Sequence, residues 1–322
     1  MTKSALRTLT EALATATLLA ACGGPASPPD TTAPELTAAF PPDGYHGFTH
    51  DDVVRLEFSE PMDPASVEGA FALRGPGGVT IATDFTWEDE NRRLLVRPRV
   101  PLAYSNDASY VNFTWSLGTE ARDPAGNALD RPYQATFSTL RKLTTTLPPE
   151  TIDGMVFSDN MHLTYPDRAY TWVGDRDTNQ CAYSYLSFDL TQLPADAVAV
   201  GDVRFFAYAL SVTGDPYALG ALTLEHVDYG DALDGGDFEL QPLAGANASL
   251  RVSQSWTSDW FVVPFLGGWL EQDIEAGRRH FQLRYRMENC TNHDGQHDFL
   301  NLATAEDTAG HAPYVEVDYY AP

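Results

Sequence analysis

The sequence predicts an all-β protein built from two β-sandwich domains. Short segments with apolar residues at every second position recur along the chain, and clusters of Gly, Pro, Asn and Asp separate them. Only one segment, Leu266–Ala276, has a helical pattern, and Gly277 follows it as a stop signal. The 322 residues are 43% hydrophobic and 11% aromatic, which is enough apolar material for two packed cores.

The first predicted sandwich has strands of five to eight residues. Residues 54, 56 and 58 form one apolar face. Segments 80–87 and 92–97 read as a hairpin joined at residues 88–91. Phe113 and Trp115 share a face with Val111, and the pattern repeats at Ala135 and Phe137 in a last strand. This spacing is typical of an antiparallel sandwich.

Three motifs in this region carry a family resemblance. They are PPDG at residues 41–44, FSEPMDPASV at 58–67 and DPAGN at 123–127. Together they resemble the bacterial Ig-like domains of S-layer and surface proteins, and the resemblance covers about residues 34–139. It implies an Ig-like domain at 35–140 that serves as a spacer or adhesion module. In physical terms these are fold residues: the prolines end a strand, Asp63 is expected to cap the following turn, and DPAGN reverses the chain.

The N-terminus predicts export. Lys3 and Arg7 precede a short apolar run, and residues 19–22 read Leu-Ala-Ala-Cys. Residues 1–21 are therefore expected to be a signal peptide, whose apolar run at 12–21 is too short to span a bilayer as a mature helix. The cut site resembles a bacterial lipobox, which implies that Cys22 is diacylated, and Gly23 resembles a signal for sorting to the outer membrane. Residues 22–34 would form a flexible, proline-rich stalk.

The rest of the chain is expected to be a linker and a second sandwich. Residues 141–150, KLTTTLPPE after Arg141, are polar and proline-containing, and predict a stiff linker. Residues 151–322 contain six strand patterns and the one helix, which fits a jelly roll. The segments at 185–208, 260–285 and 313–317 resemble the DNRLRE-type, carbohydrate-binding-module-like domain of secreted bacterial proteins. The stretch 228–258 departs from that family's pattern.

The net charge of the chain excludes some classes of binding partner. The formal net charge is −25, and residues 151–322 hold 26 of the 45 acidic residues but only 8 of the 20 basic ones. Such a field repels phosphate backbones and anionic head groups, so nucleic-acid binding is excluded. Divalent cations and neutral sugars remain compatible, and the charge by itself is also explained by solubility outside the cell.

Cys181 and Cys290 remain once Cys22 is assigned to the lipid. An even pair in an exported chain predicts one disulfide. Neither cysteine lies in a C-x-x-C motif, which disfavours a metal or catalytic role.

Two clusters could hold a metal ion. Asp175, Asp177 and Asn179 place oxygen donors at alternate positions, which suits Ca²⁺, although the EF-hand is excluded because Gly and Glu are missing at its sixth and twelfth positions. A solvated acidic turn is the alternative. His293 and His297 have the i, i+4 spacing of zinc ligands, but Gly295 predicts a loop there, which disfavours zinc.

No phosphate loop, G-x-S-x-G motif or supported catalytic triad is present in the sequence, so we expect no enzymatic activity and no cofactor beyond structural Ca²⁺. By the family resemblance, the second domain is expected to bind a polysaccharide through aromatic rings in loops. The candidates are Trp172, Tyr217, Tyr229 and Trp256. The predicted function is a lipid-anchored, non-catalytic cell-envelope protein at the outer membrane or cell surface; the alternative is a structural or protein-binding envelope component without a sugar ligand.

Overall fold

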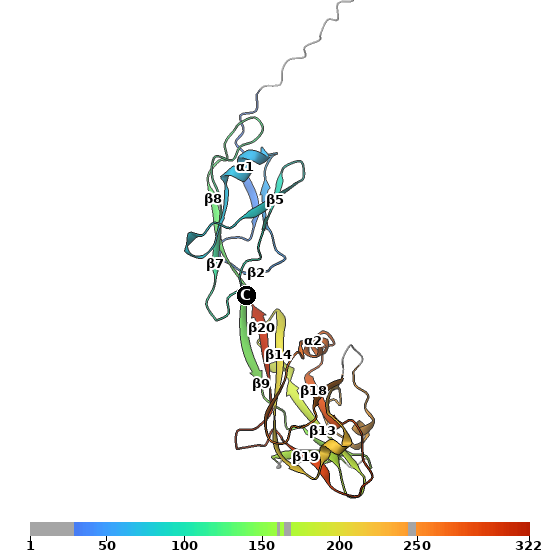
Figure 1. The fold of residues 1–322 in the computed structure, drawn as a ribbon. Helices are drawn as coiled ribbons and strands as arrows, with labels where there is room; N and C mark the ends of the chain where they lie inside the picture. Colours follow the sequence, from blue (N-terminus) through green and yellow to red (C-terminus); the bar gives the residue numbers. More distant parts are fainter. Residues whose placement is uncertain (1–28, 160–161, 164–168, 244–248) are drawn as a thin grey trace, which may run out of the picture.

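The computed structural model describes residues 29–159, 162–163, 169–243 and 249–322. Two β-sandwich units follow one another along the chain, as Figure 1 shows, and the prediction of an all-β, two-sandwich protein is confirmed. Cys22, the signal segment and most of the stalk lie outside the described residues. Within the described part, no helix is both long and apolar enough to span a bilayer.

The first domain packs two four-stranded sheets against each other. One sheet has the order β1 (Leu36–Phe40), β3 (Val54–Phe58), β6 (Arg93–Pro98), β5 (Thr83–Glu88), and the other has the order β2 (Tyr45–Phe48), β8 (Tyr133–Thr139), β7 (Asn112–Leu117), β4 (Phe71–Arg74). The predicted hairpin is the antiparallel pair β5–β6. Leu56, Phe113, Trp115 and Phe137 are buried between the sheets, which confirms the predicted alternation.

Two of the three family motifs, at residues 58–67 and 123–127, meet at one end of this domain. Asp63 precedes helix α1 (Pro64–Ala70), but its side chain makes no capping hydrogen bond; the Ser66 hydroxyl instead donates to the Asp63 carbonyl at 2.8 Å. The expected capping role of Asp63 is therefore wrong. The carboxylate of Asp123 accepts the Asn127 backbone N–H at 2.8 Å and the Asn127 amide at 2.7 Å, which confirms DPAGN as a built turn. The Asp63 N–H donates to the Arg122 carbonyl at 2.8 Å, so the two motifs brace each other.

The second domain curls one continuous sheet around its core. Its strands and helix are β9 (Arg141–Leu147), β10 (Gly154–Phe157), β11 (His162–Leu163), β12 (Tyr170–Asp175), β13 (Cys181–Asp189), β14 (Ala199–Thr213), β15 (Leu222–Val227), β16 (Ser249–Ser253), β17 (Asp259–Val263), α2 (Gly267–Glu275), β18 (His280–Met287), β19 (Asp298–Ala303) and β20 (Tyr314–Ala321). The main path runs β16-β15-β18-β13-β12-β19-β14-β20-β9. Strand β14 pairs first with β20 and then with β19, so it joins the two layers. Phe188, Phe205, Phe281 and Leu302 lie in the core between them.

The segment expected to be a linker is instead an edge strand. Residues 141–147 form β9 and pair with β20 from Arg141↔Ala321 to Leu147↔Val315. The prediction took the threonines at 144–146 as polar linker residues, but β-branched threonine suits a half-exposed strand. Only Leu140 separates β8 from β9, and its side chain is buried.

Contacts between the two domains surround this junction. The Lys142 N–H donates to the Ser105 carbonyl at 2.7 Å, and the rings of Tyr104 and Tyr320 meet edge-to-face at 5.5 Å. Gly47, at φ +104°, lies so close that an added Cβ would sit 3.1 Å from the Cβ of Pro322. The first domain is therefore packed against the second rather than connected by a free tether.

Candidate functional site

The four predicted ligand aromatics all make packing contacts within the second domain. Tyr229 and Trp256 are each 7% exposed and belong to hydrophobic clusters, so the prediction that they stack on a sugar is wrong. Trp172 lies in strand β12, not in a loop, with its ring stacked on Phe299 at 4.8 Å. The half-buried Tyr217 uses its hydroxyl to hold the Trp256 carbonyl at 2.5 Å. For Trp172 and Tyr217 a ligand role stays a prediction.

A different pair of rings borders a hollow on the outer face of the second domain. We call this hollow the aromatic cleft; it has a volume of about 400 Å³ and is lined by Tyr183, Glu225, Phe238, Glu239, Leu240, Gln241, Pro242, Ser249, Arg284 and Arg286. The rings of Tyr183 and Phe238 are parallel within 7° and 4.4 Å apart. Both side chains are partly exposed, so the pair presents apolar ring surface beside polar groups.

A charged network forms the floor of the aromatic cleft. The buried carboxylate of Glu225 accepts one hydrogen bond from Nε of Arg284 at 2.8 Å and another from Nε of Arg286 at 2.6 Å. Arg284 also donates to the Leu240 carbonyl at 2.9 Å, and its guanidinium lies 5.2 Å from the centre of the Tyr183 ring. The Arg286 side chain is about a third exposed, and its Nη atoms make no hydrogen bond to any residue that the structure describes. These donors face a ligand-sized space.

The strand register explains why these residues meet. Arg284 and Arg286 occupy alternate positions of β18, so they share one face, while Leu283 and Tyr285 face the core. Glu225 on β15 lies directly opposite Arg284. The segment after β15 folds a short 3-10 helix, Gly235–Glu239, over this face and supplies Phe238.

Sequence reasoning missed this site. The available signal was the alternation of charged and apolar residues at 281–286, with two arginines inside a strand pattern. What it could not show is that Phe238, in the very stretch that departs from the family pattern, packs on Tyr183 some 55 positions earlier.

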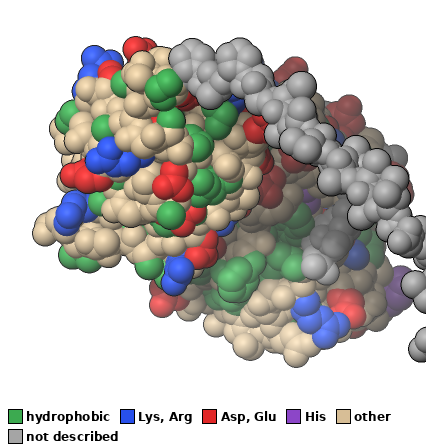
Figure 2. All heavy atoms as spheres, turned by 90° about the horizontal axis from the view of Figure 1, so that it is seen from above, with side chains coloured by type: hydrophobic (Ala, Val, Ile, Leu, Met, Phe, Trp, Pro, Cys, Tyr) green, Lys and Arg blue, Asp and Glu red, His purple; other side chains and the backbone are tan. Residues whose placement is uncertain are grey.

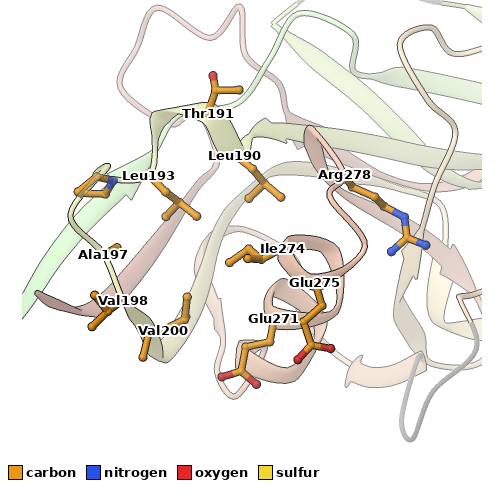
Figure 3. Close-up of a pocket in the computed structure, with 12 residues that line it drawn as sticks. Leu190, Thr191, Leu193, Ala197, Val198, Val200, Glu271, Ile274, Glu275 and Arg278 are labelled. Carbon is orange, nitrogen blue, oxygen red and sulfur yellow. The ribbon is translucent and has the colours of Figure 1, made fainter. Parts of the chain in front are cut away.

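A second hollow is lined mostly by apolar residues. This apolar hollow has a volume of about 500 Å³ and lies between the chain at 190–200 and helix α2. In Figure 3, Leu193, Val198 and Ile274 line it, while Glu271 and Glu275 project from α2 at its edge. Val198 and Ile274 are exposed. No aromatic ring is among its lining residues, so it offers no stacking platform for a sugar.

The predicted calcium triplet does not converge. Asp175 is buried, whereas the Asp177 carboxylate is exposed and lies 3.5 Å from Nε2 of His297. Asn179, in a left-handed turn at φ +58°, accepts the Thr291 hydroxyl at 3.4 Å. His293 and His297 lie in a loop, as expected, and no described group of three possible metal ligands includes both.

One carboxylate cluster occurs in the first domain. Asp30, Glu60 and Asp123 bring ligand atoms within 4.8 Å of one another. Burial, followed by the charges of Asp30 and Asp123, raises the pKa of Glu60. Because the carboxylate of Asp123 already accepts both hydrogen bonds from Asn127, this cluster is explained as part of the turn.

The disulfide prediction is confirmed. Cys181 and Cys290 are bonded, with their Cα atoms 5.2 Å apart and 109 positions between them in the sequence. The bond ties the start of β13 to the loop that follows β18.

Comparison with known proteins identifies the first domain. Residues 30–139 match the family model of a bacterial Ig-like domain. This confirms the resemblance drawn from the three motifs, while the resemblance of the second domain to the DNRLRE type stays a prediction. No curated protein matches the chain.

Similar solved structures include PcoC, CopC and an S-layer protein. PcoC, a methionine-rich copper resistance protein from Escherichia coli, is 17% identical, with 34% of this chain and 99% of that chain covered and a TM-score of 0.27. CopC from Methylosinus trichosporium OB3b is 15% identical, with 33% of this chain and 92% of that chain covered and a TM-score of 0.25. The N-terminal part of the bacterial S-layer protein SbsC is 10% identical, with 49% of this chain and 40% of that chain covered and a TM-score of 0.26. These low scores carry no argument about ligands.

The Ig-like domain and the disulfide together indicate a protein that works outside the cytoplasm. Figure 2, which views the molecule from above, shows acidic and basic side chains interspersed on this face. Such a mixed surface suits a soluble envelope module.

Proposed function

We propose that this chain is a non-catalytic cell-envelope protein whose second domain binds a polysaccharide in the aromatic cleft. The observation that carries the proposal is the parallel pair Tyr183–Phe238 beside the unoccupied Nη donors of Arg286. An aromatic face stacks on the apolar face of a sugar ring, and guanidinium N–H groups donate to its hydroxyl or carboxylate oxygens. The size of the cleft fits a few sugar units.

The charge of the floor favours acidic sugars. On the floor two arginines share the single carboxylate of Glu225, which leaves one positive charge in excess there, while the exposed Glu239 is the second carboxylate of the cleft lining. A uronic acid unit would place its carboxylate against Arg286 in a bidentate pair. Neutral sugars would keep the stacking contact but lose this pair.

The first domain would hold the binding domain away from the membrane. In this proposal Cys22 carries the lipid, residues 23–34 form the stalk, and the Ig-like domain is a spacer or adhesion module at the outer membrane or cell surface. Mass spectrometry of the mature N-terminal peptide should find a diacylglyceryl group on Cys22. An unprocessed cytosolic protein would contradict the anchoring.

The binding experiment uses the mature chain with Cys22→Ser, so that it is soluble without lipid. A glycan array that includes uronic acid polymers should give hits, and calorimetry should show at least tenfold weaker binding for Arg286→Gln and for Phe238→Leu. Arg251→Gln is the matched control, because Arg251 is an exposed arginine on β16 that pairs with Glu288 away from the cleft lining. A blank array, or equal loss in the control, would refute the proposed site.

The apolar hollow favours the alternative function, a structural or protein-binding envelope component. Its exposed Val198 and Ile274 offer apolar area to a protein surface, with Glu271 and Glu275 at the rim. If crosslinking on intact cells captures one partner with the wild type and Arg286→Gln but not with Ile274→Glu, the alternative is favoured.

A further inference from the structure

Two buried carboxylates lie side by side at one end of the second domain. Asp175 ends β12 and Asp298 begins β19, and the two are register partners in this antiparallel pair. Directly opposed residues project to the same face of a sheet, so their side chains are neighbours. Asp175 is 1% exposed and Asp298 is 3% exposed. Neither takes part in an ion pair with any described residue.

The surrounding chain is packed closely around this pair. A Cβ on Gly174, at φ +140°, would lie 2.0 Å from the Asp298 carbonyl oxygen. A Cβ on Gly214, at φ +65°, would lie 2.1 Å from Oδ1 of Asp298. On its other side Asp175 is the register partner of Cys181, whose disulfide to Cys290 anchors the chain just before Thr291 and Asn292. The two carboxylates are therefore enclosed by chain segments that are held in place.

The two carboxylates differ in how well their oxygens are satisfied. Asp298 accepts the Asp215 backbone N–H at 2.5 Å and the Asn292 side-chain amide at 3.1 Å. Neither oxygen of Asp175 has a well-formed hydrogen bond to any residue in the described part of the chain. The groups that face it are the Thr291 hydroxyl, the Asn292 backbone N–H and the carboxylates of Asp298 and Asp294.

Such a group needs a counter-charge. An unpaired buried carboxylate is strongly disfavoured, and a second and third carboxylate nearby make it worse. Asp175 is buried beside the carboxylates of Asp298 and Asp294, so this site favours the uptake of a proton or a cation.

We propose that Asp175 and Asp298 are ligands of a structural Ca²⁺ ion, with Asp294 as a neighbouring negative charge that is not itself a ligand. Oxygen is the donor atom of both ligands, and both nearby cysteines are locked in the disulfide, which disfavours a thiophilic metal. Asp177 and Asn179 lie outside this site, since Asp177 faces His297 and Asn179 faces Thr291. The proposal is independent of polysaccharide binding.

The test measures the melting temperature of the chelator-treated protein against Ca²⁺. The expected dissociation constant is roughly 10⁻⁴–10⁻³ M, as in extracellular modules, and Ca²⁺ in large excess should raise the melting temperature by about 5 °C. Asp175→Asn should abolish the shift, and Asp294→Asn, which changes an exposed residue and leaves the core untouched, should weaken Ca²⁺ binding at least threefold in calorimetry. Asp177→Asn is the matched control and should bind as the wild type does.

Each result of the Ca²⁺ titration either supports or overturns the proposed calcium site. A Ca²⁺ shift that is lost in Asp175→Asn and kept in Asp177→Asn supports the site. A shift that is lost only in Asp177→Asn would place the ion at the turn that contains Asp177, and this result overturns the proposal. No shift at 10 mM Ca²⁺ in protein shown to be metal-free means that Asp175 is held protonated, which also overturns it.

Discussion

Asp153 should make the second domain less stable as the pH rises. Its side chain is buried, with one carboxylate oxygen accepting the Ala305 N–H at 2.9 Å. Burial raises its pKa from the ordinary 3.8 to about 7, and the charge of Glu306 adds to the effect. Because the folded state then holds a proton that the unfolded state releases, this contribution to stability is present below pH 3.8 and is lost as the pH rises to 7.

The magnitude follows from the two pKa values. The interval from 3.8 to 7 corresponds to about 4 kcal/mol in the free energy of unfolding, of which about 3 kcal/mol falls between pH 5 and pH 8. Asp153→Asn keeps an acceptor for Ala305 but cannot ionise. Relative to the wild type, the variant should therefore gain about 3 kcal/mol between pH 5 and pH 8.

Urea unfolding followed by fluorescence, at pH 5, 6, 7 and 8, measures this difference. The difference between variant and wild type is the informative quantity, because the titration of all other groups cancels in it. Asp84→Asn is the control, since Asp84 is an exposed carboxylate with a surface ion pair to Arg99 and should change the free energy by less than about 1 kcal/mol at every pH. A variant-minus-wild-type difference that stays constant from pH 5 to pH 8 would refute the reasoning.

Two further predictions concern the end of the domain that holds the disulfide. Replacing Cys181 and Cys290 with serine should lower the free energy of unfolding by about 2–5 kcal/mol in oxidising buffer, because the bond closes a long loop; loss of less than 1 kcal/mol would contradict this. Gly174→Ala should destabilise the domain by more than about 3 kcal/mol, since its Cβ would meet the Asp298 carbonyl, whereas Gly230→Ala, at φ +71° with open space around it, should cost only about 1 kcal/mol. Equal costs in the two glycine variants, measured by urea unfolding, would argue against the close approach.

Local sequence patterns were sufficient to predict much of the fold. Alternation at residues 54–58 and at 110–115 predicted strands, and Leu56, Phe113 and Trp115 on their inward faces are buried as expected. The three turn motifs predicted the first domain, which the family match confirms. The disulfide followed from counting the cysteines in an exported chain.

The structural features that were not predicted from the sequence depend on pairing between distant segments. Residues 141–147 looked like a linker because nothing local shows that β20, more than 160 positions later, provides their hydrogen-bonding partner. Tyr229 and Trp256 looked like loop aromatics because a segment without periodicity can still fold back over a core. The aromatic cleft was missed for the same reason, since Tyr183, Phe238 and Arg286 come from three separate segments.

The edge strand β9 has a mechanical consequence. It runs from the junction along the second domain in Figure 1, and its register pairs with β20 continue from Arg141 to Leu147. Inter-strand hydrogen bonds lie perpendicular to the strands, so a pull that reaches β9 from the first domain acts along the strand and shears all the pairs together. A load on this protein would thus be shared across a whole ladder instead of opening it one bond at a time.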